Sequence, residues 1–589
     1  MAQQFDPNRT RDRDQEAIIF LWFLLIALVG VVIWLGYTRL HCTVPQLIEF
    51  SLYPLLAAGM LFEVLRFASS AKAKRATLWP RSTPFVSHAK DRANLAEAVN
   101  DHNILVGYES DGQPWLWSNS KRRMQAIAFG KSGAGKTTLL HTIAEQDIAS
   151  GCPVIFIDGK GEFKLLSELM PAIRLAGRIG QLRLLDPTHP EISSPYNPFW
   201  SPTGDLDEQV SSIFEALRRT ANVNEFFDSH QRVYLEDIAK ILSYSGKRVN
   251  IYDVLVTAYD KSVMRRQMKI AWERVNVDPN ATRQQRLTLH MNIHHLLATF
   301  EDDDRVTKIQ GLLNDLMTFQ GDNLARITGS YEGLLTLNEV IENNLILYVS
   351  LNTNIRPRAT AALGRVLLQN LQLIIGQRYS QLAATHPFVS VIMDEFAPFA
   401  YGNFADVIQQ ARGTNICFLF SLQNSPQLLE VGKAFRNDLS SAPNTTFMLR
   451  NSEQETAEQF LDASGRVTKL RRSVQVRKSG FLNPEFSEQE TGSQSEVLET
   501  MALDEHLKMM PTGQLELLMS DDDRGLLYKH VHIRQPIRHY ANLPLSLYPS
   551  LAVPQQESVG LNLRLPAPDL EEPAPPPQRG RRSHQGARQ

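Results

Sequence analysis

Short apolar runs alternate with stretches of helical periodicity along most of this chain. The runs that we predict as strands are residues 124–129, 154–157, 345–351, 388–393, 415–421 and 445–449. Continuous apolar runs of this length are typical of strands that are buried on both faces of a parallel sheet. The first run is followed by a helical stretch at residues 138–149. We therefore predict an α/β fold with a mostly parallel, doubly wound sheet.

The periodicity changes between residues 205 and 325. Apolar residues recur there at helical spacing, as in Val210, Ile213, Phe214 and Leu217, which predicts an all-helical insertion into the α/β domain. The chain then ends in a segment with seven prolines from Pro554 onward, which is typical of disorder. The expected organisation is an N-terminal anchor at 1–70, the α/β domain in two parts at 71–204 and 326–545, the insertion at 205–325 and a tail at 546–589.

Two N-terminal segments are candidate membrane spans. Residues 17–36 carry no charge, and as a helix they would cover about 30 Å, which is the thickness of the hydrocarbon core. A cleaved signal peptide is the competing interpretation, but the run is too long and lacks a small-residue cleavage site. Residues 45–65 contain Glu49, Pro54 and Glu63, so a helix on the membrane surface or in a soluble core is the alternative there.

Basic residues predict the orientation of these spans. They precede the first span and follow the second, and only Arg39 lies between the two. The positive-inside rule then places both termini and the α/β domain in the cytoplasm.

Composition excludes several classes of protein. The 589 residues have a formal net charge of -2, so the chain is not a polycation that binds nucleic acid through bulk charge. A mean hydropathy of -0.23 excludes a polytopic transporter. The three cysteines, Cys42, Cys152 and Cys417, form neither a disulfide framework nor a zinc pattern.

The first predicted strand ends directly in the P-loop sequence GKSGAGKT, residues 130–137. Glycines let the backbone wrap closely around phosphates, and the loop N–H groups with the helix N-terminus attract the anion. Lys136 is expected to reach the β- and γ-phosphates of ATP, and Thr137 to bind Mg²⁺. The predicted nucleotide-binding residues are Gly130, Lys131, Ser132, Gly133, Ala134, Gly135, Lys136, Thr137 and Thr138.

A carboxylate pair ends another buried strand, at residues 388–393. Asp394 follows this strand and is predicted to hold Mg²⁺ together with Thr137, and Glu395 is predicted to polarise the attacking water as general base. The strand at 415–421 leads to Gln423. If that strand lies between the P-loop strand and the Asp394 strand, Gln423 emerges beside the γ-phosphate and can report hydrolysis.

Two further features allow more than one interpretation. His290 and His294 are one helical turn apart, but no nearby carboxylate or cysteine completes a metal site, so we interpret them as solvated or core residues. Residues 466–478 contain six basic residues and no acidic ones. They form either an edge strand protected by charge or a patch that faces DNA.

The arrangement resembles the type IV secretion coupling proteins of the TraG/TraD type, which belong to the FtsK/HerA class of P-loop ATPases. The resemblance covers roughly residues 15–540. Besides GKSGAGKT and VIMDEF, it rests on DGKGE at residues 158–162, on Ala411-Arg412-Gly413 and on the late segment 498–533. Gly159 stands where the family has proline.

The resemblance implies a homohexameric ATPase anchored in the inner membrane of a bacterium. It would hand DNA with an attached relaxase-type protein, or effector proteins, to a secretion channel built on inner-membrane proteins. Arg412 would be an arginine finger, and we expect it at the nucleotide-binding end of the sheet. The loop between the spans and the tail are both shorter than is usual in the family.

Two other functions compete with that of a coupling ATPase. One is an ATPase that powers channel assembly or protein export without touching DNA. The other is a membrane scaffold that binds nucleotide without hydrolysing it, and the intact Lys136, Asp394 and Glu395 argue against this one.

Overall fold

The computed structural model describes residues 84–200, 206–217, 225–246, 248–301, 303–355, 357–380, 386–479, 485–521 and 525–536. The chain divides into two compact units, Met1–Ser82 and Thr83–Gln589, and all described residues belong to the second. The predicted spans at 17–36 and 45–65 and the predicted tail at 546–589 lie outside the described residues. Within the described ranges, no helix combines the length and apolarity that a membrane crossing requires.

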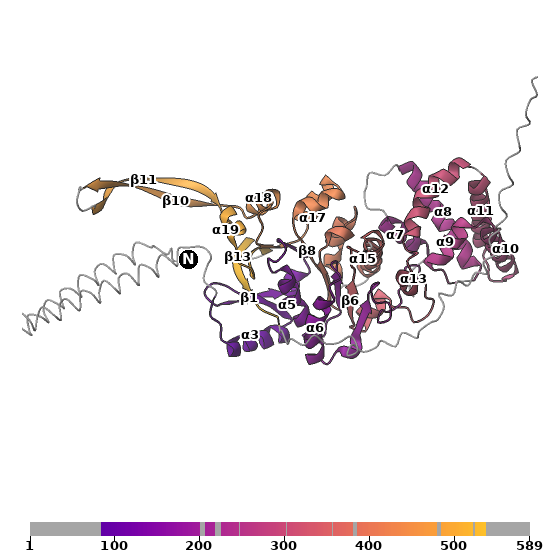
Figure 1. Ribbon diagram of the computed structural model, residues 1–589, viewed down its shortest axis with the longest axis horizontal. Helices are drawn as coiled ribbons and strands as arrows, with labels where there is room; N and C mark the ends of the chain where they lie inside the picture. Colours follow the sequence, from indigo (N-terminus) through magenta and orange to yellow (C-terminus); the bar gives the residue numbers. More distant parts are fainter. Residues whose placement is uncertain are drawn as a thin grey trace, which may run out of the picture. The chain divides into compact units, whose positions relative to one another are not determined.

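An 11-stranded sheet organises the second unit (Figure 1), in the order β2-β1-β13-β12-β9-β3-β8-β7-β4-β6-β5. The strands from β9 to β5 in this order are parallel, and β12, β13, β1 and β2 extend the sheet in antiparallel fashion. Their bounds are β1 Asn103–Tyr108, β2 Pro114–Ser118, β3 Ala126–Phe129, β4 Val154–Asp158, β5 Leu182–Leu185, β6 Ile346–Ser350, β7 Val389–Asp394, β8 Ile416–Leu422, β9 Thr445–Leu449, β12 Gln514–Asp521 and β13 Gly525–Ile533.

The strands predicted from apolar runs are confirmed as β3, β4, β6, β7, β8 and β9. β8 lies between β3 and β7, which is the position that the interpretation of Gln423 required. Because parallel strands all end at one edge of the sheet, β3, β7 and β8 bring the residues that follow them to the same edge.

Helices cover both faces of the parallel part of the sheet. α5 (Lys136–Ala149) and α6 (Phe163–Leu175) pack on one face, where alternate strand residues such as Ala128 and Phe156 join the helices in one core. α15 (Pro357–Tyr379) and α16 (Phe404–Ala411) belong to the other face, where Phe404 of α16 stacks edge-on against Phe418 of β8. The strands are thus buried on both sides, which explains why they have no polar alternation.

The remaining short helices lie in the connections of the sheet. They are α3 His88–Asn100, α4 Asn119–Arg122, α14 Leu337–Glu342, α17 Lys433–Ser441, α18 Gln454–Ala463 and α19 Asp504–Met509, with 3₁₀ turns η1 Ile179–Gln181, η3 Ala397–Phe399, η4 Arg412–Thr414 and η5 Ser425–Glu430.

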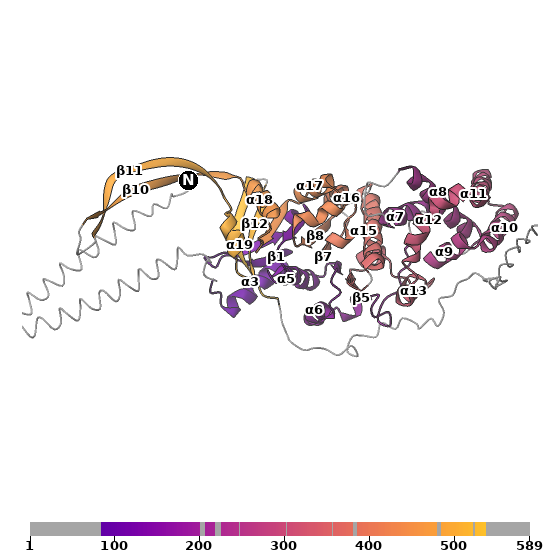
Figure 2. The same ribbon diagram turned by 45° about the horizontal axis from the view of Figure 1, so that its top comes forward.

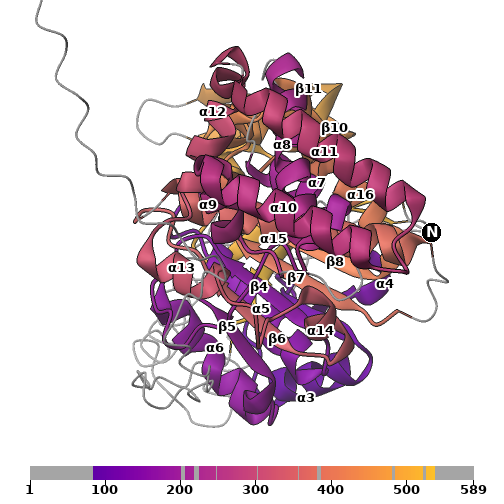
Figure 3. The same cartoon turned by 90° about the vertical axis from the view of Figure 1, so that its right-hand side faces the viewer.

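The described residues between positions 206 and 328 form helices and their connections (Figure 3). α8 contacts α7, α9, α10, α11 and α12, and α7 also packs against α15 of the sheet domain. The bounds are α7 Leu206–Leu217, α8 Glu225–Tyr244, α9 Ile251–Tyr259, α10 Lys261–Val277, α11 Arg283–Glu301, α12 Asp303–Met317 and α13 Asp322–Thr328. Whether this segment is a separate domain with the bounds 205–325 stays a prediction.

The basic segment predicted at 466–478 lies in a separate two-stranded sheet. β10 (Arg466–Ser479) pairs with β11 (Glu485–Thr500) in antiparallel register, with Arg466 opposite Thr500. This ribbon leaves the sheet domain beside α18 and α19 (Figure 2). Both of its strands are edge strands, and contact with DNA stays a prediction.

Candidate nucleotide-binding site

The P-loop joins the end of β3 to the start of α5. Two backbone hydrogen bonds anchor it to neighbouring strands: Gly130 N–H donates to the Leu422 carbonyl at 3.2 Å, and Lys131 N–H donates to the Arg450 carbonyl at 3.0 Å. Lys136 is buried, and its ammonium donates to the Gly130 carbonyl inside the loop. The loop therefore surrounds its own lysine, with the N-terminus of α5 directly behind it.

Asp394 is the last residue of β7 and is completely buried. Its Oδ2 accepts a hydrogen bond from Thr137 Oγ1 at 3.1 Å, and its Oδ1 accepts one from Ser421 Oγ at 2.9 Å. The structure thus brings together the two residues predicted to bind Mg²⁺, although they are far apart in the sequence. A hydroxyl and a carboxylate are hard oxygen donors, so this pair fits Mg²⁺.

Glu395 has a φ of 61°, in the left-handed region that is rare for residues other than glycine. Its N–H donates to Ser421 Oγ at 3.2 Å, which helps to hold this backbone conformation. The carboxylate accepts hydrogen bonds from Gln423 Nε2 at 3.2 Å and from Gln427 Nε2 at 3.2 Å. The turn after β7 therefore points Glu395 at the two glutamine side chains that follow β8.

Gln427 was not predicted from the sequence, although a signal was present. Asn424 and Gln427 form a capping box around η5, in which the Asn424 side chain accepts from the Gln427 N–H. The Gln427 side chain reaches back with its oxygen to the Gln423 N–H at 3.0 Å and with its nitrogen to Glu395. The cap thus positions an amide on the candidate general base.

Burial changes the proton affinity of groups at this edge. It lowers the pKa of the Lys136 ammonium, against the opposing charges of Glu395 and Asp394. Burial also raises the pKa of Asp158, at the end of β4, to about 6, and the neighbouring Asp394 adds to this rise. A buried lysine whose positive charge is poorly solvated gains strongly from an anionic partner such as a phosphate.

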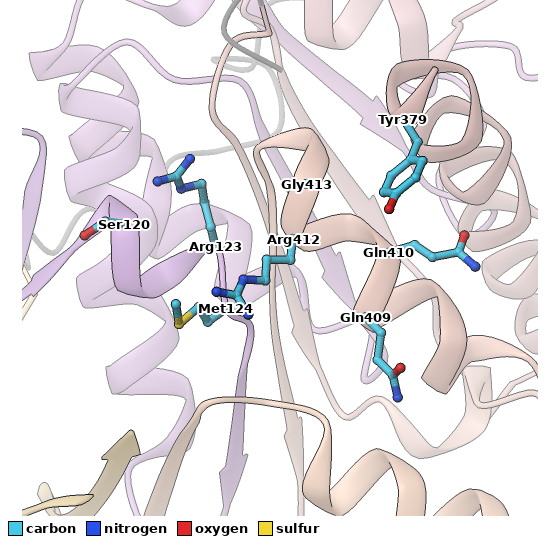
Figure 4. A pocket seen from close by; sticks show the side chains of 8 residues that line it. All are labelled: Ser120, Arg123, Met124, Tyr379, Gln409, Gln410, Arg412 and Gly413. Atoms are coloured by element: carbon cyan, nitrogen blue, oxygen red, sulfur yellow. The ribbon is translucent and has the colours of Figure 1, made fainter. Parts of the chain in front are cut away.

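Arg412 does not lie at this edge, so that expectation is wrong. It is in η4, immediately before β8, and it lines an exposed pocket with Arg123 and Met124, which precede β3 (Figure 4). The reason is topological: α16 carries the chain from the end of β7 back to the start of the parallel strand β8. Residues just before β8 must therefore lie at the edge opposite the P-loop.

His290 and His294 lie exposed, one helical turn apart on α11. His290 and His294 stack edge-on at 4.3 Å between ring centroids on α11, and among the described residues no group of histidine, cysteine and carboxylate side chains could hold a metal ion. Cys152 and Cys417 are free thiols.

Together the sheet order, the P-loop and the buried carboxylate define an α/β P-loop protein. A family model described as "TraM recognition site of TraD and TraG" matches residues 388–511. The type 4 coupling protein DotL of Legionella pneumophila is 20% identical over 461 residues, which cover 69% of this chain and 58% of DotL. The chain thus spans little more than half the length of this curated relative.

Two solved structures of the coupling protein TrwB share the fold. TrwBdeltaN70 in an unbound form has a TM-score of 0.54 at 14% identity, covering 78% of this chain and 94% of TrwBdeltaN70. TrwB in complex with ADP and Mg²⁺ has a TM-score of 0.52 at 15% identity, covering 78% of this chain and 95% of TrwB. The family model, DotL and TrwB together confirm the resemblance to the type IV secretion coupling proteins that the motifs indicate.

Proposed function

We propose that this chain is an ATPase that couples ATP hydrolysis to the delivery of DNA with its attached protein, or of effector proteins, to a type IV secretion channel. In this proposal the chain acts as a homohexamer anchored in the inner membrane through residues 17–36 and 45–65. The observation that carries it is the meeting of the P-loop, Asp394 and Glu395 at one edge of a sheet whose fold is that of nucleotide-bound TrwB.

Each residue at this edge has a proposed role. When ATP binds, the Lys136 ammonium donates to the β- and γ-phosphates instead of to the Gly130 carbonyl. The attraction to the phosphates offsets the unfavourable burial of its positive charge. Thr137 and Asp394 hold Mg²⁺, which supplies neutralisation of phosphate charge when it is bound. Glu395 orients and polarises the attacking water, and Gln423 with Gln427 fixes the direction of its carboxylate.

Arg412 acts in this proposal on the nucleotide of a neighbouring subunit. It cannot serve the P-loop of its own chain, because the sheet lies between them. Its side chain is exposed, and the described part of the chain offers it no ion pair. An exposed arginine at the opposite edge fits a ring in which that edge meets the next subunit's site, where it would stabilise charge in the transition state.

The test measures ATP hydrolysis by the full purified chain with and without single- or double-stranded DNA. Hydrolysis that rises with DNA supports the DNA-coupled function. A hydrolysis rate that does not change with DNA favours instead an ATPase that powers channel assembly or protein export. Absence of hydrolysis under both conditions, in a protein that binds ATP, overturns the proposal in favour of a scaffold.

A second measurement tests the DNA contact of the ribbon. Replacing Lys469, Arg471 and Arg472 together by alanine is expected to weaken DNA binding and to flatten its salt dependence by up to about three phosphate contacts. The matched control replaces three exposed cations of α10, Arg265, Arg266 and Lys269. If the salt dependence of DNA binding is the same for both triple variants, the basic residues of the ribbon do not contact DNA, and the ribbon is an edge strand protected by charge.

A further inference from the structure

Lys160 lies in the loop that follows β4, and its ammonium is placed on the candidate metal ligand. Lys160 Nζ is 2.9 Å from Asp394 Oδ2, the same oxygen that accepts from Thr137 Oγ1 at 3.1 Å. The Lys160 side chain is 32% exposed, whereas Asp394 is 0% exposed. Among the described residues, Lys160 is the only cation in direct contact with the Asp394 carboxylate. It approaches this buried carboxylate from the solvent side of the site.

The loop at residues 158–162 is built to hold this lysine in place. The Asp158 carboxylate accepts the Lys160 and Glu162 N–H groups, each at 2.9 Å, and the Tyr348 hydroxyl at 3.0 Å. Gly159 N–H donates to the Asp394 carbonyl at 2.9 Å, which ties the loop directly to the end of β7. Three hydrogen bonds thus fix the loop backbone at residues 159, 160 and 162, and the bond from Tyr348 holds the Asp158 carboxylate that accepts two of them.

Both glycines of the loop are required by close approach. A Cβ at position 159 would lie 2.7 Å from the Glu395 carbonyl oxygen. Gly161 has a φ of +63°, and a Cβ there would lie 2.7 Å from the Asn352 backbone. The two glycines of the DGKGE sequence therefore let the loop pack closely against the end of β7, where Lys160 contacts Asp394.

The local electrostatics follow from this contact. The Lys160 ammonium donates a hydrogen bond to Asp394 Oδ2, so the attraction between the two opposite charges acts at contact distance beside a buried carboxylate. A fully buried carboxylate without a counter-charge is strongly destabilising, and Lys160 removes that cost. A metal ion that approaches Asp394 without a nucleotide meets a competing positive charge at the same oxygen.

We propose that Lys160 is a built-in counter-ion that competes with Mg²⁺ for Asp394 and thereby makes Mg²⁺ binding depend on the nucleotide. The phosphates supply the negative charge that lets Mg²⁺ and Lys160 occupy the site together. The inference rests on the proposed nucleotide site, but it concerns the protein without nucleotide, so it is tested without hydrolysis.

The test compares full-length wild type with Lys160→Met, using thermal unfolding and Mg²⁺ titration calorimetry in the absence of nucleotide. We expect the variant to unfold at a lower temperature, millimolar Mg²⁺ to restore much of the loss, and its Mg²⁺ affinity to exceed that of wild type at least tenfold. Lys160→Arg keeps the charge and is expected to behave as wild type. Lys164→Met, an exposed lysine four residues along, is the matched control.

Three results overturn the proposal. They are equal Mg²⁺ affinity in wild type and Lys160→Met, rescue that survives when Asp394→Asn is added, and wild-type Mg²⁺ binding that is as tight without ADP as with it. The last comparison needs no variant, so it can overturn the proposal even if Lys160→Met fails to fold. Loss of hydrolysis in other variants leaves these outcomes unaffected, which separates this inference from the proposed function.

Discussion

The two edges of the parallel sheet differ in the surroundings of the charged residues to which we assign a role. At the P-loop edge, Asp394 is fully buried and bound by Thr137, Ser421 and Lys160, and Glu395 is held by two glutamines. At the opposite edge, Arg412 lies exposed in a pocket of about 500 Å³, and the described residues give it no ion pair.

This difference indicates which groups act within one chain and which act on another molecule. Completed polar networks at one edge preorganise a site that a single chain can build by itself. At the other edge Arg122 is paired with Asp147, but the exposed Arg412 is available to an anionic partner. The following changes test this division, from the largest expected effect to the smallest.

Lys136→Ala is expected to abolish ATP hydrolysis. The variant removes the charge at the phosphates, which typically costs several kcal/mol of transition-state stabilisation. Steady-state phosphate release measures it. Lys164→Ala, at an exposed lysine of α6 outside the P-loop, is the control and is expected to keep most of the activity. Comparable rates for the two variants would contradict the assignment of Lys136.

Glu395→Gln is expected to stop turnover, by roughly 10²- to 10⁴-fold, while nucleotide binding is retained. The glutamine keeps the size of the side chain and can still accept one of the two amide hydrogen bonds, but it cannot accept a proton from water. Binding of a fluorescent ATP analogue and single-turnover hydrolysis separate the two effects. Near-normal turnover removes Glu395 from the mechanism and leaves its left-handed backbone unexplained by catalysis.

Arg412→Ala is expected to leave ATP affinity largely intact and to cut turnover by orders of magnitude. The decisive measurement mixes this variant with Lys136→Ala, each inactive alone. An arginine that acts on the neighbouring subunit lets mixed rings regain some hydrolysis, since some interfaces then pair an intact P-loop with an intact arginine. Arg123→Ala, in the same pocket, is the control. If mixed rings that are shown to contain both variants have no activity, Arg412 does not act on the neighbouring subunit.

The smallest expected effect concerns Asp158 and pH. Its pKa is raised from 3.8 to about 6 in the folded chain, so folding takes up a proton between these values. Its contribution to the free energy of unfolding therefore falls by on the order of 3 kcal/mol as pH rises from about 4 to about 6, and it is constant above.

Denaturant unfolding of wild type and Asp158→Asn over this pH range measures the effect. The wild type is expected to lose stability relative to the variant as pH rises, because the asparagine cannot ionise. A difference that does not change with pH would mean that Asp158 is ionised in the folded chain throughout, and that its hydrogen bonds outweigh its burial.

Several features of this protein were determined by the sequence alone. Local patterns predicted the strands β3, β7 and β8 and the P-loop. A strand that is buried on both faces needs an uninterrupted run of apolar residues, so such a run is enough to predict it. The rule that parallel strands end at one edge then brings Lys136, Asp394 and Gln423 together. The antiparallel strands β1, β2 and β12 were not predicted as members of this sheet, because their pairing depends on partners far away in the chain.

Only the tertiary structure decided which side chains meet and which edge each occupies. Gln427 and Lys160 reach Glu395 and Asp394 from connections whose paths depend on distant strands. The capping-box spacing of Asn424 and Gln427 indicates a helix start, but it does not indicate that Gln427 contacts Glu395. Arg412 was misplaced because its nearness to Glu395 along the chain hid the return of α16 to the opposite edge. The physical reason is that side-chain contacts depend on distance in space, which the order of the strands in the sheet sets.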